Sequence, residues 1–208
     1  MEIIKSSVEL ITPVDKQYIL NLIEYATRNC YQSFDKVKEG SAEILINSIK
    51  ERNHWTPFEN FSLTFKIITN RGVMAELTRH RHASFNVMST RYVNYSKDKF
   101  GNQVKFIDIA EGFPETDVES YLKWENACRC SEDYYMDLIN FHGQKPDMAR
   151  SVLNNSVATE IIMTANLREL YYMIKLRTAP PAHPEIRVIM NKVCELCKFE
   201  LPEIFGDL

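Results

Sequence analysis

The sequence lacks any apolar run that approaches the roughly 20 residues needed to cross a membrane as a helix. Its first residues, Met-Glu-Ile-Ile-Lys-Ser-Ser, also lack the apolar core of a secretory signal peptide. Both absences argue against a membrane-embedded or secreted protein. We therefore expect a cytoplasmic protein that has no membrane partner.

An excess of positive charge is missing as well. The formal net charge is −3, and a protein that coats nucleic acid would instead present a broad basic face. Hydrophobic residues make up 45% of the chain and charged residues 25%, as is usual for a soluble globular protein. The composition favours small-molecule partners over nucleic acid.

The cysteines do not indicate a disulfide framework, because there are five of them and no secretion signal. Cys128 with Cys130, and Cys194 with Cys197, are close enough in sequence to suggest zinc ligands. Both pairs lie in segments with helical amphipathic periodicity, where cysteine usually acts as a small apolar core residue. Structural zinc sites usually use knuckle-like loops with glycine nearby, so we expect no metal site.

The chain shows no internal repeat and no low-complexity linker, and 208 residues suffice for one domain, residues 1–208, with a substantial core. Apolar periodicity predicts an α+β fold in which a mostly antiparallel, twisted sheet packs against a helical layer. Strands are expected over residues 8–11, 61–67, 92–95 and 104–109, with a hairpin joining the third to the fourth. Residues 158–163 fit either a strand or a helix, and we favour a strand. Seven helices are expected. The first starts at Thr12 or Asp15 and runs past 25, the second starts from a cap at Ser41 and runs past 49, and the third covers 71–82. The others run from a Thr116–Glu119 capping box to about 142, from Pro146 through Arg150, from a cap at Asn166 to about 177, and over 184–199.

Residues 79–92, called the signature segment below, concentrate charge and hydrogen-bonding groups. Arg79, Arg81 and Arg91 lie there with His80 and Ser89. Arginine stays protonated, and its planar fork matches phosphate or carboxylate in paired hydrogen bonds. The segment therefore suits anion binding, although a solvated, charged helix end would show similar residues.

Two positions in this segment limit the possible chemistry. On a continuous helix Arg79 and Arg81 would point in nearly opposite directions. Either the helix ends near His80, or the two arginines serve different ligands or subunits. Ser89 has no glycine-rich elbow and no suitably spaced base, so we expect it to hydrogen-bond rather than to act as a nucleophile.

The order Arg-His-Arg, seven residues, Ser, one residue, Arg-Tyr resembles the signature of flavin-dependent thymidylate synthases. Flanking pieces resemble the same family in the same order, and together they span roughly residues 25–205. They are His54-Trp-Thr56-Pro-Phe-Glu59, Ala149-Arg150-Ser-Val-Leu, Thr164-Ala-Asn166-Leu-Arg168, Leu176-Arg177, Ala182-His183-Pro-Glu-Ile and Pro202-Glu-Ile-Phe205.

The resemblance implies an enzyme that makes thymidylate (dTMP) from deoxyuridylate (dUMP). Methylenetetrahydrofolate would supply the carbon and reduced FAD the reducing equivalents, with NADPH as the source of the electrons that reduce the flavin. The enzyme would be a homotetramer whose active sites use several subunits. The other thymidylate synthase class attacks uracil with a cysteine in a Pro-Cys setting, which none of the cysteines here has. The flavin-dependent route needs instead a cation that stabilises negative charge on the ring.

Matching positions imply roles for individual residues. Arg177 would be the activating cation at the uracil edge, and His54 would lie by the flavin and folate as the second catalytic residue. The implied dUMP-binding residues are Glu76, Arg79, Ser89, Arg91, Arg150 and Arg177. The implied FAD-binding residues are His54, Thr56, Glu59, Arg79, His80, Arg81, Asn166, Arg168 and Tyr172.

Several positions depart from the family pattern. Many members carry a glutamate where this chain has Val87 or Met88, a histidine at Pro181 and a glutamine at His183. FAD affinity, folate geometry or the product could differ in consequence. Two alternatives therefore stay open: a diverged member that makes another 5-substituted pyrimidine nucleotide, such as 5-hydroxymethyl-dUMP, and a non-catalytic nucleotide or RNA binder.

Overall fold

The computed structural model of the chain describes all 208 residues. Its centre is a four-stranded sheet in the order β2 (Ser7–Leu10), β3 (Ser62–Asn70), β6 (Ala158–Asn166) and β4 (Ala83–Val87). All neighbouring strands in it are antiparallel, as predicted. The alternation that predicted β3 is confirmed, since Leu63, Phe65 and Ile67 are fully buried while their neighbours are not.

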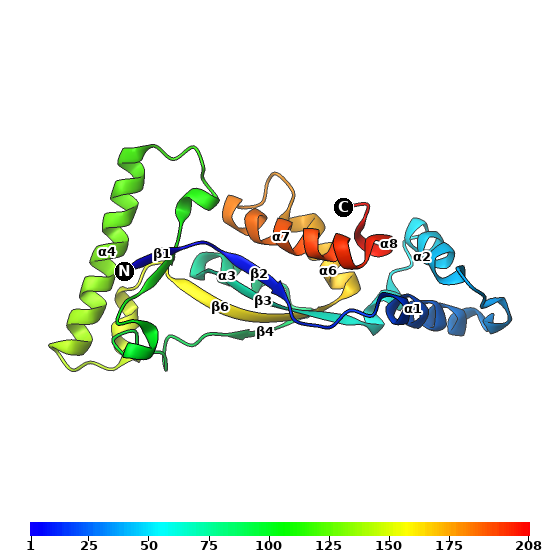
Figure 1. The fold of residues 1–208 in the computed structure, drawn as a ribbon, viewed down its shortest axis with the longest axis horizontal. Coiled ribbons are helices and arrows are strands. Elements are labelled where there is room, and N and C mark those ends of the chain that lie inside the picture. Colours follow the sequence, from blue (N-terminus) through cyan, green and yellow to red (C-terminus); the bar gives the residue numbers. More distant parts are fainter.

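Helices cover one face of this sheet. Figure 1 shows α3 (Arg71–Leu77), α6 (Leu167–Arg177), α7 (Pro184–Glu200) and α8 (Pro202–Phe205) on the same side of the strands. A core cluster of 28 buried residues joins these helices to the inward face of the sheet. The predicted α+β architecture is confirmed, and none of the helices is both long and apolar enough to span a membrane.

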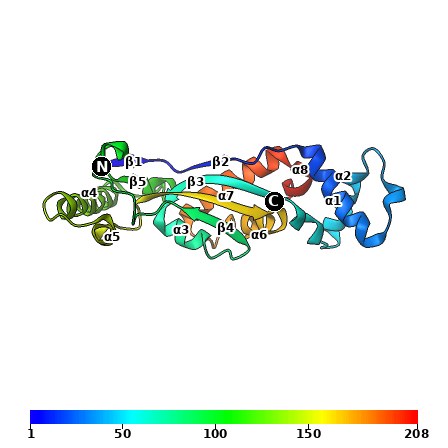
Figure 2. The ribbon, with the colours of Figure 1, turned by 90° about the horizontal axis from the view of Figure 1, so that it is seen from below.

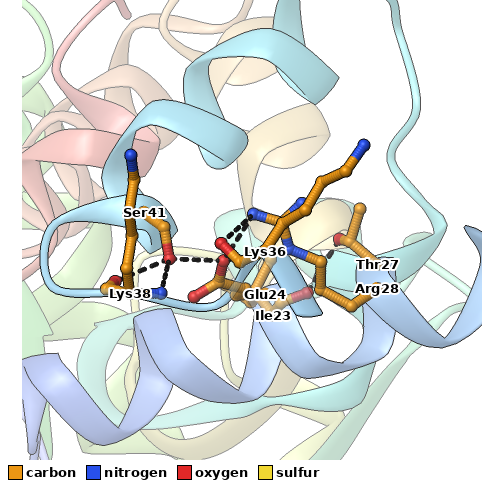
Figure 3. Close-up of polar contacts among 7 residues, drawn as sticks. All are labelled: Ile23, Glu24, Thr27, Arg28, Lys36, Lys38 and Ser41. Atoms are coloured by element: carbon orange, nitrogen blue, oxygen red, sulfur yellow. Dashed lines mark hydrogen bonds and ion pairs between the residues drawn. The ribbon is translucent and has the colours of Figure 1, made fainter. Parts of the chain in front are cut away.

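Two further helices, α1 (Lys16–Tyr31) and α2 (Ser41–Glu51), form one end of the elongated molecule (Figure 2). Buried Glu24 joins them, since it pairs with Arg28 at 2.9 Å and lies 2.8 Å from the Ser41 hydroxyl (Figure 3). The prediction that Ser41 caps α2 is wrong. Gly40 holds the cap position with a left-handed φ of 73°, which glycine adopts without strain.

The opposite end carries a smaller unit built around α4 (Val118–Asn140). Strands β1 (Glu2–Ile4) and β5 (Lys105–Ile107) pair in parallel beside it, and α5 (Pro146–Ala149) packs against it. Seven buried residues form a second core cluster here: Tyr95, Val104, Phe106, Cys128, Tyr135, Ala149 and Val157. The α4 cap is Asp117, whose side chain accepts from the Ser120 N–H, so the Thr116–Glu119 capping box is wrong.

Three other predictions need correction. The helix predicted over 71–82 ends at Leu77, because residues 83–87 pair as β4 with the edge of β6. Residues 92–95 form a turn and no hairpin, since Tyr95 is buried against Tyr135 and donates its N–H to that hydroxyl at 3.3 Å. Arg150 follows α5 in a separate 3-10 turn, Arg150–Val152, instead of lying in the same helix.

Candidate active site

The last residue of α6, Arg177, lies at the centre of a polar cluster. Its Nε donates to His80 Nε2 at 2.9 Å, and its Nη1 donates to Glu76 Oε2 at 3.0 Å. Glu169, in the first turn of α6, lies 3.5 Å from His80 Nδ1. We call Glu76, His80, Glu169 and Arg177 the α6 cluster. It brings together side chains from α3, from the turn after it and from both ends of α6.

The protonation state of the α6 cluster follows from its burial. Burial, and then the charge of Arg177, lower the pKa of His80 to about 4, so its imidazole is neutral at physiological pH. Burial also raises the pKa of Glu169. A neutral imidazole can accept the Nε–H of Arg177, whereas an imidazolium could only repel it.

Arg177 keeps hydrogen-bonding capacity beyond these contacts. Its third contact is a long one, from Nη2 to the Glu76 carbonyl oxygen at 3.4 Å. One N–H on each Nη nitrogen then has no partner within the chain. The side chain is 19% exposed, so these groups can reach a ligand carbonyl while the guanidinium stays fixed.

Several residues implied for flavin binding lie on or beside α6. Arg168 Nη1 pairs with Glu59 Oε1 at 2.6 Å, and both side chains are about half exposed. Tyr172 is exposed and its ring meets the edge of His80 at 6.2 Å between centroids. A cavity of about 630 Å³ lies here, and Trp55, Arg168, Tyr171, Tyr172 and Lys175 are among its lining residues.

Three of the implied flavin residues differ in their surroundings. Asn166 uses its side-chain oxygen to cap α6, because Oδ1 accepts the Glu169 N–H at 2.8 Å, which confirms the predicted cap. Thr56 is exposed at the start of the 3-10 turn Thr56–Asn60. His54 is exposed and lines a separate hollow beside Arg52 and Tyr31. The chain alone therefore does not bring His54 into contact with the α6 cluster.

A second group of polar residues follows the end of β4. Arg150 Nη1 donates to Thr90 Oγ1 at 3.3 Å, which brings Arg150 to the second half of the signature segment. Ser89 and Arg91 are exposed beside it, and the Arg91 guanidinium lies over the Tyr92 ring at 5.4 Å. We call Ser89, Thr90, Arg91 and Arg150 the β4-end cluster.

The two halves of the signature segment lie at opposite ends of β4. The register pairs Ala83 with Ala165, next to the start of α6, and Val87 with Ile161 toward the other end of β6. At about 3.3 Å per residue the five residues of β4 span roughly 15 Å. The signature segment is therefore divided by an extended strand, and its two halves do not meet within one chain.

The exposed arginines of the signature segment, together with Arg150, fit a phosphate-containing ligand. Arg79, Arg81, Arg91 and Arg150 are exposed, and no carboxylate lies within ion-pair distance of any of them. Unpaired arginines at a surface with aromatic neighbours suit phosphates and flat rings, as FAD and a nucleotide would present. The donor set of this chain thus fits a flavin dinucleotide.

Two residues of these clusters are not among the site residues that the sequence implies. The sequence places Glu169 only in a helix cap, and its contact with His80 depends on tertiary packing. Thr90 lies within the signature segment but carries no charge that would single it out. The buried cysteines play no part in either cluster, and burial raises the pKa of Cys128, Cys194 and Cys197, which disfavours their thiolates.

Known proteins resemble this chain over nearly its full length. A family model described as thymidylate synthase complementing protein matches residues 14–203. A probable flavin-dependent thymidylate synthase of Mycobacterium phage D29 is 29% identical over 206 residues, covering 96% of this chain and 86% of that protein. The flavin-dependent thymidylate synthase of Geobacter sulfurreducens is 30% identical over 192 residues, covering 89% and 80%.

A solved structure shares the fold. A UMP/dUMP methylase from Streptomyces cacaoi, determined with 5-Br dUMP bound, superposes with a TM-score of 0.82. The match covers 99% of this chain and 96% of that one at 24% sequence identity. An identity this low establishes the common architecture and leaves the substrate of this chain to its own residues.

Proposed function

The chain belongs to the thymidylate synthase complementing protein family, whose relatives include flavin-dependent thymidylate synthases, and we propose that it converts dUMP to dTMP. In this proposal methylenetetrahydrofolate supplies the carbon, reduced FAD the reducing equivalents and NADPH the electrons. The observation that carries it is Arg177, which is fixed by Glu76 and a neutral His80 and still presents free N–H groups.

Arg177 would act on the uracil ring. A fixed cation beside the uracil carbonyls stabilises the negative charge that develops when the ring is attacked. Its orientation is set before the ligand arrives, because Nε and Nη1 are already held. No cysteine nucleophile is required, in keeping with the raised thiol pKa values of Cys128, Cys194 and Cys197.

The flavin would lie against the exposed side of α6. Arg168, Glu59, Thr56 and Tyr172 would hold it, with Asn166 near the helix start and Arg79, His80 and Arg81 from the signature segment. Bound FAD would supply reducing equivalents that no side chain of this protein can supply. His54 would lie by the flavin and folate.

A complete site in this proposal needs more than one copy of the chain. Arg177 and Glu76 would contact the uracil. Ser89, Arg91 and Arg150, together with Arg79, would hold the same nucleotide, chiefly by its phosphate. Because β4, roughly 15 Å long, lies between His80, which contacts Arg177, and Ser89, we propose that the α6 cluster of one subunit faces the β4-end cluster of another. A homotetramer with shared sites would satisfy this requirement.

The test is mass spectrometry of the nucleotide after incubating the protein with dUMP, methylenetetrahydrofolate, FAD and NADPH. We expect the product to carry one added methyl group. A hydroxymethylated product would replace the proposal with the diverged activity suggested by Val87, Met88, Pro181 and His183. Unchanged dUMP together with saturable, salt-sensitive RNA binding would instead indicate a non-catalytic binder.

A further inference from the structure

The contacts that hold Arg177 continue through His80 to Glu169. We propose that Glu169 is a positioning residue, which fixes the tautomer of His80 and thereby the orientation of Arg177 toward its ligand. The inference rests on the proposed function only in taking that ligand to be the uracil of dUMP. Glu169 itself would touch neither substrate nor flavin.

The donor and acceptor pattern leads to this assignment. The Nε–H of Arg177 can only donate, so His80 Nε2, 2.9 Å away, must offer a lone pair. A neutral imidazole with a free lone pair on Nε2 carries its proton on Nδ1. The Nδ1 nitrogen lies 3.5 Å from Glu169 Oε1, a contact longer than a normal hydrogen bond, and no other carboxylate lies within ion-pair distance of the ring.

The geometry of α6 explains why one ring can connect these residues. Glu169 lies in the first turn of the helix and Arg177 at its end, so eight residues separate them, about 12 Å of helix rise. The His80 imidazole lies between their side chains and contacts both. The Glu169 backbone is itself fixed, because its N–H is bound by the capping oxygen of Asn166 at 2.8 Å.

Burial makes the contact effective. The His80 side chain is 5% exposed and that of Glu169 is 11% exposed, so water competes little for either group. The other groups facing the pair are few: Tyr172 meets the His80 ring edge, Glu76 binds the far side of Arg177, and Arg168 and His82 act on the Glu169 charge. Without the Glu169 oxygen, Nδ1 would lose the nearest carboxylate that can face its proton, and the alternative tautomer would turn a donor toward Arg177.

Two substitutions separate an acceptor role from a purely structural one. Glu169→Ala removes the acceptor, whereas Glu169→Gln keeps an oxygen that can accept from Nδ1–H and removes only the charge. We expect the alanine variant to weaken dUMP binding and lower kcat about tenfold or more. The glutamine variant should recover both values to within about threefold, because the oxygen and not the charge orients His80.

The matched control is Glu119→Ala, which removes an exposed glutamate from the first turn of α4, far from the cluster. It should leave dUMP binding and kcat unchanged, although, like Glu169→Ala, it removes a glutamate that interacts with the N-terminal end of a helix. Circular dichroism of all three variants reports whether α6 and α4 remain folded. If Glu169→Ala fails to fold, the glutamine variant and the wild-type tautomer still decide the question.

The direct readout is the tautomer of His80, from long-range ¹H–¹⁵N spectra of protein labelled at histidine, with His80→Gln to assign the signal. We expect the Nδ1–H form in the wild type and in Glu169→Gln, and a mixture in Glu169→Ala. An Nε2–H form in the wild type, or unchanged dUMP binding and kcat in Glu169→Ala, would overturn the inference. A wild-type protein that neither binds nor methylates dUMP would defeat the proposed function instead, while the tautomer would still test Glu169.

Discussion

Glu76 Oε2 lies 3.0 Å from Arg177 Nη1, so the guanidinium proposed to act on uracil is already part of an ion pair. The Arg177 side chain is 19% exposed and that of Glu76 is 34% exposed, so solvent screens the pair only partly. The carboxylate restricts the guanidinium to one orientation and offsets some of its charge. Arg177 is therefore positioned by two side chains that accept from different edges of the same planar group.

Replacing Arg177 should remove most of the activity. We expect Arg177→Ala to lower kcat by about 10²–10³, the loss typical of removing one preorganised donor to a developing anion. Arg177→Lys should also be poor, because an ammonium carries its three donors on one nitrogen and lacks the planar fork that contacts His80 and Glu76 while presenting further N–H groups to a ligand. Steady-state kinetics checks both variants.

The matched control for this prediction is Arg129→Ala, which removes another arginine that pairs with a glutamate, on exposed α4. Its activity should equal that of the wild type, and FAD affinity should be largely retained in all three variants. Near-normal turnover in Arg177→Ala would contradict the assigned role.

The neutral state of His80 makes stability depend on pH. The pKa of this group is about 4 in the folded chain, below its ordinary value of 6.5, so the unfolded chain binds more protons between these values. The contribution of neutral His80 to the free energy of unfolding is complete above about pH 6.5 and is lost as the pH falls toward 4. We expect this group to contribute on the order of 2 kcal/mol to the drop in the free energy of unfolding.

Urea denaturation at about pH 7 and about pH 4.5, at one protein concentration, measures this dependence. His80→Gln should show a shallower loss of stability over the same interval. Glu169 opposes the trend in the wild type, because its raised pKa favours the protonated, folded form at low pH. Parallel curves for wild type and His80→Gln would mean that His80 is not held neutral.

The long, strongly periodic elements could be predicted from sequence. The alternation in β3, the apolar run of β6 and the Asn166 cap of α6 each follow from local residues, and the structure contains all three. The strand β4 was missed because it has five residues, none of them fully buried. Its conformation depends on backbone pairing with β6, more than seventy residues away in sequence, which local patterns do not reveal.

The site could be predicted as a set of residues but not as an arrangement. The side chains of the signature segment suggested one anion site because they are close in sequence. The extended strand between His80 and Ser89 separates them, so proximity along the chain did not mean proximity in space. Because α3 ends at Leu77, neither Arg79 nor Arg81 lies on a helix. Helical geometry therefore does not force their side chains to point in opposite directions.

The exposed ion pair between Arg168 and Glu59 should matter for cofactor binding and little for folding. Both side chains are about half exposed, and such pairs contribute roughly 0–1 kcal/mol to stability. We expect Arg168→Ala to change the free energy of unfolding by less than about 1 kcal/mol and to weaken FAD binding about tenfold or more. Flavin fluorescence titration measures the affinity. A large loss of stability with unchanged FAD binding would contradict the prediction that this ion pair serves cofactor binding rather than folding.

The division of the signature segment by β4 leads to the sharpest test of a shared site. If one subunit supplies the α6 cluster and another the β4-end cluster, Arg177→Ala and Arg150→Ala chains are each inactive alone. A mixed assembly, however, contains sites that take Arg177 from the Arg150→Ala chain and Arg150 from the Arg177→Ala chain. For random pairing around a two-fold axis, roughly a quarter of the sites are intact.

Co-expression of the two variants with different affinity tags, followed by purification through both tags, yields these mixed assemblies. We expect them to regain activity, whereas an assembly of differently tagged Arg177→Ala chains should stay inactive. Recovery cannot occur if each chain forms its own site, because every chain then carries one defect. Absence of recovery in verified mixed assemblies would therefore place both clusters in the site of a single subunit, which would require β4 and its neighbouring turns to rearrange on ligand binding.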